Sequence, residues 1–209
     1  PLRALAVNHL IKDVNGTYTV NTDGTVDAKV VFRTEAKHDH MPFSARVSTS
    51  YSGPLFEIAP AYLKEELDNP IHMMGEILSV HEYFPESGPN PHPEFTPTHS
   101  PQSVVARLQS DRSLKGYTQE FELSCKIYGA VKIVDGNALL HLQLLDGMLS
   151  EPVESATFKV ILPEGIKPVQ SFVSGAWQKT NAKIVELENG VSIPPFTPKS
   201  KYEQLFFGL

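Results

Sequence analysis

An alternation of apolar and polar residues from Tyr117 to Ile133 constrains the fold of this chain more than any other feature. A period of two places every second side chain on the same face of a β-sheet, so the segment predicts a strand. Asp135-Gly136 follows, and these residue types favour a two-residue type I′ turn, which needs a positive φ at both positions. The pattern therefore predicts a β-hairpin with the opposed apolar pairs Ile133–Ala138, Val131–Leu140, Gly129–Leu142 and Ile127–Leu144.

Two further hairpins are predicted by glycine-closed loops between alternating segments. The first joins Thr17–Asn21 to Thr25–Glu35 through a three-residue loop that ends at Gly24, and its predicted pairs are Val20–Val26 and Tyr18–Ala28. The second turns at Glu188-Asn189-Gly190, and its predicted pairs are Leu187–Val191 and Val185–Ile193. Both registers place apolar residues opposite one another, so both hairpins are expected to bury one face.

The remaining segments predict an all-β fold. Shorter strands are expected at Phe43–Tyr51, Leu55–Ile58, Ile77–Phe84, Ala156–Leu162, Val169–Ala176 and Ala182–Leu187. One short helix is expected at Pro60–Leu67, because a proline starts it and Asn69-Pro70 ends it. About ten strands and one helix predict an antiparallel β-sandwich with a jelly-roll-like topology.

Residues 85–101 hold six prolines in seventeen positions, which predicts a polyproline-like loop without regular structure. We interpret residues 1–209 as a single domain that carries this segment as an insert, with an extended C-terminal arm at 194–209. The alternative is two small sandwiches, at 1–84 and 102–209, because a structureless loop of this length inside one compact domain is unusual.

Composition excludes several classes of function. The formal net charge is −6 and no basic arm is present, which argues against direct binding of nucleic acid. No apolar segment approaches 18 residues, so no membrane-spanning helix is expected. A single cysteine, Cys125, rules out a disulfide within the chain and lies on the apolar face of the hairpin, where a buried thiol is expected. These features favour the cytoplasm or an assembled particle over a disulfide-rich secreted protein.

Few residues suggest catalysis. His38-Asp39-His40 would place both imidazoles on one face of a strand, as in cupin-like metal enzymes, but the Glu that follows the pair in such enzymes is missing. We therefore interpret this segment as a polar loop and expect no metal or other cofactor. His81-Glu82 lacks the second histidine of a zincin motif, and Glu120 and Glu122 share one strand face that we expect to be solvated. His141 is expected opposite Ala130, where it could titrate near neutral pH.

Two features point to assembly with other subunits. The second face of the central hairpin is partly apolar and is expected to be covered; its candidate contact residues are Tyr128, Leu139 and Leu145. The C-terminal arm is held extended by prolines and ends in large apolar side chains, at Leu205, Phe206, Phe207 and Leu209. Such an arm must dock either on its own domain or on a neighbouring subunit, because water disfavours it.

The sequence therefore predicts a non-enzymatic structural subunit of a larger assembly, of the kind that builds coats, capsids and shells, with copies of itself or related subunits as partners. A monomeric module that binds a peptide or carbohydrate is the alternative; it would use the Pro85–Pro101 segment with Tyr83, Phe84 and Phe95. A cupin-like metal enzyme built on His38 and His40 is the third hypothesis.

Overall fold

A computed structural model describes residues 9–37, 43–48, 50–51, 71–72, 74–83, 94–100, 103–109, 116, 118–134, 136–145, 151–175, 180–198 and 205–208. Strands account for most of these residues, so the chain is β-rich. Within the described ranges no helix is long and apolar enough to cross a membrane. The predicted strand Leu55–Ile58, the predicted helix Pro60–Leu67 and the His38-Asp39-His40 segment lie outside them.

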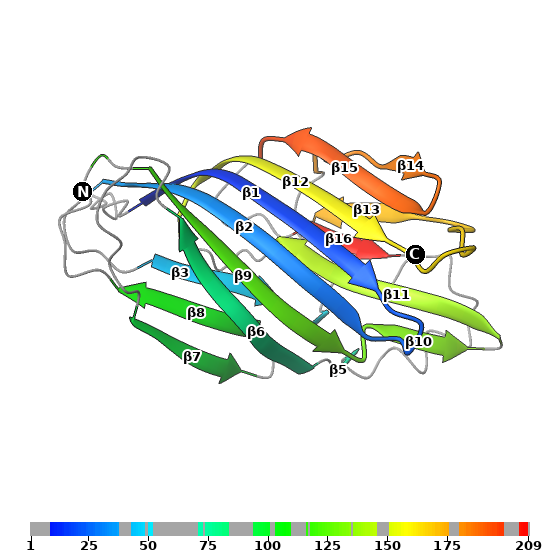
Figure 1. Cartoon of the computed structure of the whole chain (residues 1–209). Helices are drawn as coiled ribbons and strands as arrows, with labels where there is room; N and C mark the ends of the chain where they lie inside the picture. Colours follow the sequence, from blue (N-terminus) through cyan, green and yellow to red (C-terminus); the bar gives the residue numbers. More distant parts are fainter. Residues whose placement is uncertain are drawn as a thin grey trace, which may run out of the picture.

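A large mixed sheet forms one layer of the molecule (Figure 1). Its spatial order is β14 (Val185–Leu187), β15 (Gly190–Phe196), β12 (Val153–Ile161), β1 (His9–Val20), β2 (Val26–Ala36), β9 (Thr118–Tyr128) and β6 (Met74–Tyr83). The expectation of a purely antiparallel fold is wrong, because β1 and β12 run parallel. Strands that precede residues 85–101 and strands that follow them are neighbours in this sheet, since β1 lies beside β12 and β9 lies between β2 and β6.

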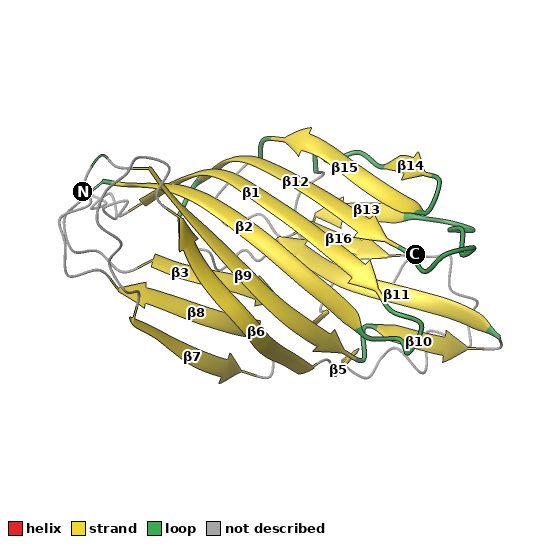
Figure 2. Ribbon diagram, viewed as in Figure 1, coloured by secondary structure: helices red, strands yellow, loops and turns green. Residues whose placement is uncertain are grey.

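Smaller sheets accompany the large one. A four-stranded sheet has the order β10 (Val131–Val134), β11 (Asn137–Leu145), β16 (Leu205–Gly208) and β13 (Phe172–Gly175). A three-stranded sheet has the order β3 (Phe43–Ser48), β8 (Ser103–Gln109) and β7 (Glu94–Ser100), and β4 (Ser50–Tyr51) pairs with β5 (Ile71–His72). In the view of Figure 2, β11, β13 and β16 lie behind the large sheet, while β7 and β8 extend below it.

Strand β7 corrects the prediction that residues 85–101 contain no regular structure. It pairs with β8 along its length, and Pro97 stands opposite Ala106. Proline lacks the N–H that a central strand needs, but β7 is the last strand of its sheet and can direct that position away from β8. The proline-rich composition was therefore compatible with an edge strand.

The first hairpin has the predicted register. Val20 pairs with Val26 and Tyr18 with Ala28, and Gly24 has a φ of 82° in the loop between them. Strand β1 begins at His9, well before the predicted start at Thr17. A register shift between Ile11 and Asp13 interrupts the alternation of buried and more exposed residues there. The first part of the strand therefore lacks the period-two pattern by which a strand is predicted.

The central hairpin is confirmed at its tip and wrong at its base. Val131 pairs with Leu140 and Ile133 with Ala138, around a two-residue loop. Ile127, however, pairs with Val26 on β2 and Gly75 on β6, so the predicted pairs Ile127–Leu144 and Gly129–Leu142 do not form. The backbone turns at Gly129, whose φ is 76°, and leads the chain from the large sheet into the four-stranded sheet.

The C-terminal hairpin is shifted by one residue from its predicted register. Leu187 pairs with Gly190, and Glu186 pairs with Val191, so the loop contains only Glu188 and Asn189. Gly190 is required for packing in the ladder, because a Cβ there would lie 2.1 Å from the carbonyl oxygen of Val160. Its φ of 149° also disfavours any other residue type.

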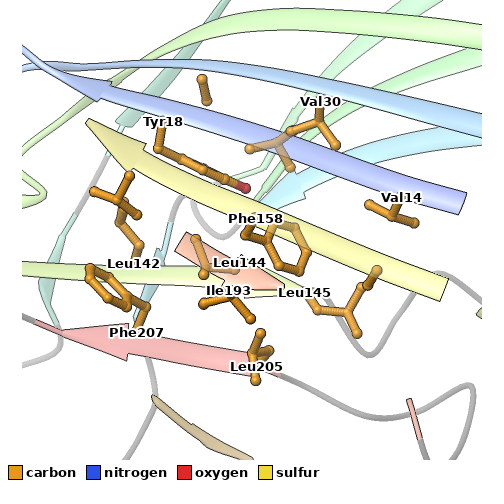
Figure 3. Packing of buried hydrophobic residues seen from close by; sticks show 14 of the residues in the cluster. Val14, Tyr18, Val30, Leu142, Leu144, Leu145, Phe158, Ile193, Leu205 and Phe207 are labelled. Carbon is orange, nitrogen blue, oxygen red and sulfur yellow. The ribbon is translucent and has the colours of Figure 1, made fainter. Parts of the chain in front are cut away.

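The hydrophobic core fills the space between the large sheet and strands β11 and β16 (Figure 3). We call the side of the large sheet that faces these strands its inner face. Gly16 on β1 lies directly opposite Phe158 on β12, and the Phe158 ring covers the position that a Gly16 side chain would occupy. Leu205 and Phe207 on β16 are fully buried in the same core, so this part of the C-terminal arm packs on its own chain.

Candidate functional site

The outer face of the large sheet carries rows of oppositely charged side chains. Ion pairs between its strands include Lys12–Glu35, Lys12–Glu154, Lys29–Glu122, Lys126–Asp27 and Arg33–Asp13, with N–O distances of 3.6, 3.2, 2.9, 3.2 and 4.0 Å. Glu122 on β9 is paired with Lys29 on the neighbouring strand β2. Opposite charges on adjacent strands are common on sheet surfaces, because they attract one another. Solvent-exposed pairs of this kind add little to stability.

Buried polar side chains gather in two groups elsewhere in the described structure. The first group lies at the end of the inner face where β1 begins and consists of His9, Thr34, Gln119 and Glu151. Thr34 on β2 pairs with Ile11 on β1 and with Gln119 on β9. Ile11 also pairs with Val153, and His9 and Glu151 each stand two residues before that pair. The strand register therefore brings an imidazole and a carboxyl group to the same end of the sheet.

This first group is polar where the rest of the inner face is apolar. Burial lowers the pKa of His9, because the charged imidazolium loses hydration there. A neutral imidazole, a carboxamide, a hydroxyl and a carboxyl group can hydrogen-bond to each other or to a small polar molecule. Among the residues that the structure describes, no three His, Cys, Asp or Glu side chains come together as a metal site.

The second group lies on β11 and consists of His141 and Gln143 with Ser48 of β3. The Ser48 hydroxyl donates a hydrogen bond to Oε1 of Gln143 at 3.1 Å. The His141 ring lies 6.4 Å from the Phe172 ring, measured between centroids. Because neighbouring β11 residues of both parities are buried, both faces of this strand are covered. The prediction that the second face of the central hairpin is also covered is thus confirmed for strand β11.

Burial also determines the protonation state of His141. Desolvation, with a smaller contribution from the positive charge of Lys132, lowers the pKa of His141 to about 4. The expectation that this histidine titrates near neutral pH is therefore wrong. Its predicted position was close, since the backbone N–H of His141 donates to the carbonyl of Ala130 at 3.0 Å.

The predicted assembly residues have different environments. Leu145, Leu205 and Phe207 are buried in the core of their own chain, so they have no surface left for a neighbouring subunit. Tyr128 and Leu139 are half-buried. The side chains of Phe206 and Leu209 lie outside the described part of the chain.

Cys125 is fully buried, as predicted. Burial, with a smaller contribution from the charge of Asp27, raises the pKa of the Cys125 thiol to about 12. The thiolate form is the nucleophile, so this thiol is inert at neutral pH.

Large apolar side chains remain exposed at the end of the molecule opposite the first polar group. Val169 and Ile166 lie in the loop between β12 and β13, and Val185 lies on the edge strand β14. The backbone N–H of Leu162, at the start of that loop, donates to the carbonyl of Asn189 in the β14–β15 turn at 2.9 Å. This bond ties the loop to the hairpin, and we call the exposed residues Ile166, Val169 and Val185 the β14-side patch.

Sequence reasoning missed the first polar group. Gln119 gave a signal, because it occupies an apolar position in the alternation of β9 and is buried accordingly. His9 and Glu151 gave no such signal. His9 is the first residue of β1 and Glu151 lies two residues before β12, so neither falls within an alternating segment.

No protein-family model matches this chain, and no curated protein matches it. The chain has weak structural similarity to solved structures of an M1 zinc metallopeptidase from Deinococcus radiodurans. A mutant bound to a Tyr-Ser-Ala substrate has a TM-score of 0.48 and 11% identity, over 96% of this chain and 42% of that one. The enzyme without substrate has a TM-score of 0.47 and 11% identity, over the same shares. The chain therefore spans less than half the length of these structures.

Proposed function

We propose that this chain is a non-enzymatic structural subunit of a larger protein assembly, and that it contacts its neighbours through the β14-side patch. The observation that carries this proposal is the exposure of Val169, Ile166 and Val185 on one loop and the adjoining edge strand. Exposed apolar side chains that form a contiguous patch are typical of surfaces that another protein covers, and the proposal is that these three act together in this way. The edge of a sheet also offers unpaired backbone groups to a partner.

The described residues with reactive side chains support a non-enzymatic role. Burial holds His141 neutral and the Cys125 thiol protonated near neutral pH, so His141 is a weak base and Cys125 a weak nucleophile. The outer face of the large sheet carries paired charges and stays solvated, which leaves the edges and loops as the surfaces on which subunits would meet.

We also infer that the chain is one domain with a β-sandwich architecture. Support comes from the core that the large sheet shares with β11 and β16, and from the pairing of early strands with late strands in that sheet. A jelly roll is built from antiparallel strands, so the parallel pairing of β1 with β12 disfavours that finer topology.

Substitutions on the patch test the proposal. Val185→Lys and Val169→Lys place a charge where we expect a neighbouring subunit, so both should weaken association measured by sedimentation. Ile133→Lys is the matched control, because Ile133 is also an exposed aliphatic side chain but lies on β10. The assignment of the contact to the β14 side would be contradicted if all three substitutions weakened association equally, or if none of them did. A chain that is monomeric before any substitution would favour the binding-module alternative.

A further inference from the structure

The chain contains two Asn-Gly pairs, Asn15-Gly16 and Asn189-Gly190, in very different backbone settings. We propose that Asn189 is a site of spontaneous deamidation and isoaspartate formation that releases the edge strand β14, and that the fold protects Asn15 from the same reaction. The proposal rests on backbone geometry and concerns a covalent modification, so it is independent of the proposed assembly.

The reaction needs only the chain and water. The backbone nitrogen of the glycine attacks Cγ of the asparagine and forms a five-membered succinimide. The Cγ–Nδ2 bond breaks, and ammonia leaves with the proton that the glycine nitrogen loses. Water then opens the ring at either carbonyl, giving aspartate or, when the main chain is rerouted through Cγ, isoaspartate. Glycine favours the attack because it has no side chain to hinder the approach.

Asn189 is placed where this ring can close. It is exposed and occupies the second position of the two-residue loop between β14 and β15. Strand β14 contains three residues and, among the described strands, pairs with β15 alone. Such a short edge hairpin opens locally at low cost. Gly190 also pairs with Ile161 on β12, and the Asn189 carbonyl accepts from the Leu162 N–H, so ring closure requires these contacts at the end of the β12–β15 ladder to open as well.

Asn15 is exposed as well, so access of water to the side chain does not distinguish the two sites. Burial of the following glycine does not distinguish the sites, because Gly16 and Gly190 are both buried and an added Cβ would lie 2.6 Å and 2.1 Å from a neighbouring atom, respectively. The difference lies in the backbone, because Asn15 pairs with Val31 on β2 and with Thr157 on β12. Ring closure at Asn15 therefore requires opening of two ladders in the centre of the large sheet.

Isoaspartate at position 189 would disturb the hairpin. It adds one carbon to the main chain of a two-residue loop, next to Gly190, where the Val160 carbonyl leaves no room for a Cβ. Gly190 also pairs with Ile161 on β12, so β15 is held in place from its other side. The strain therefore falls on β14, which we expect to detach while β15 keeps its pairing.

Ageing of the purified full chain at mildly alkaline pH tests the first part of the proposal. Peptide mass mapping that separates aspartate from isoaspartate follows both sites, with the same protein in denaturant as the reference. In denaturant the two sites should convert at similar rates. In the folded chain Asn189 should still convert, whereas Asn15 should be slowed at least about tenfold more, because it needs opening of a core ladder. Equal protection of both sites, or faster conversion at Asn15, would overturn the proposal.

Hydrogen exchange on the aged protein tests the second part. Residues 185–187 should lose protection as isoaspartate accumulates, while residues 191–196 keep theirs. The variant Asn189→Gln is the control, because its longer side chain closes the corresponding ring far less readily; its β14 should stay protected throughout ageing. If β14 remains protected in chains that carry isoaspartate at 189, the predicted release of the strand is wrong.

Discussion

Acid should destabilise this fold through His141. In the unfolded chain this histidine has its ordinary pKa of 6.5, whereas burial lowers the pKa to about 4 in the folded chain. Above the unfolded value the imidazole is neutral in both states and pH has no effect. As the pH falls from 6.5 towards 4, the unfolded state binds a proton that the folded state resists, and stability is lost over that window. At 1.36 kcal/mol per pH unit, the loss at pH 4 is about 3 kcal/mol.

The variant His141→Gln removes the titrating group and keeps a polar side chain of similar length. Urea unfolding at several pH values between 7 and 4 should show a smaller loss of stability in the variant, by about 3 kcal/mol. The comparison uses the change with pH in each protein, so a constant cost of the substitution cancels. His9→Gln provides a second, independent comparison. Burial also lowers the pKa of His9, so this substitution should reduce the loss of stability in acid as well, and its effect should add to that of His141→Gln.

Identical pH dependence in the wild type and His141→Gln would refute the reasoning. It would mean that the imidazole is hydrated in the folded chain, or that β11 is covered on only one face.

Three further predictions follow from the packing. Gly16→Ala should destabilise the fold by about 1–3 kcal/mol in thermal or urea unfolding, because its methyl group meets the Phe158 ring at 2.6 Å; no loss would mean that the ring moves freely. Truncation after Pro198 removes β16 and its buried side chains, so it should lower the melting temperature without lowering the mass of the assembly; the reverse result would show that the arm joins subunits. Cys125 should resist a thiol reagent until the chain unfolds, because its pKa is raised to about 12, and rapid labelling of folded protein would contradict its burial.

Sequence reasoning succeeded where local pattern and turn chemistry agree. The register of the first hairpin follows from its alternation together with Gly24, and both features are local. The tip of the central hairpin is correct for the same reason. Its base could not be predicted, because the alternation continues unchanged through Gly129 while the chain passes from one sheet to another. Which sheet a strand joins depends on contacts with distant segments.

Tertiary packing also explains the other differences. Gly190 was assigned to a loop, but the carbonyl of Val160 demands a glycine in the ladder at that position. Similarly, the parallel neighbour of β1 is β12, more than a hundred residues away in the sequence, and no local signal reports that pairing. The polar group around His9 depends on it, since Glu151 reaches the same end of the sheet through β12.

The charged outer face illustrates what composition alone can show. A net charge of −6 without a basic arm predicts that the chain does not bind nucleic acid directly. The ion pairs across β1, β2, β9 and β12 show something that composition cannot, namely that these lysines and this arginine each lie next to a carboxylate.

The mass of the intact chain in solution tests the proposed structural role most directly. Analytical ultracentrifugation over a range of concentrations should give species that are multiples of the 23.1 kDa chain, and Val185→Lys should shift them towards the monomer. A single 23.1 kDa species at every concentration, unchanged by that substitution, would contradict the role of this chain as a self-assembling subunit.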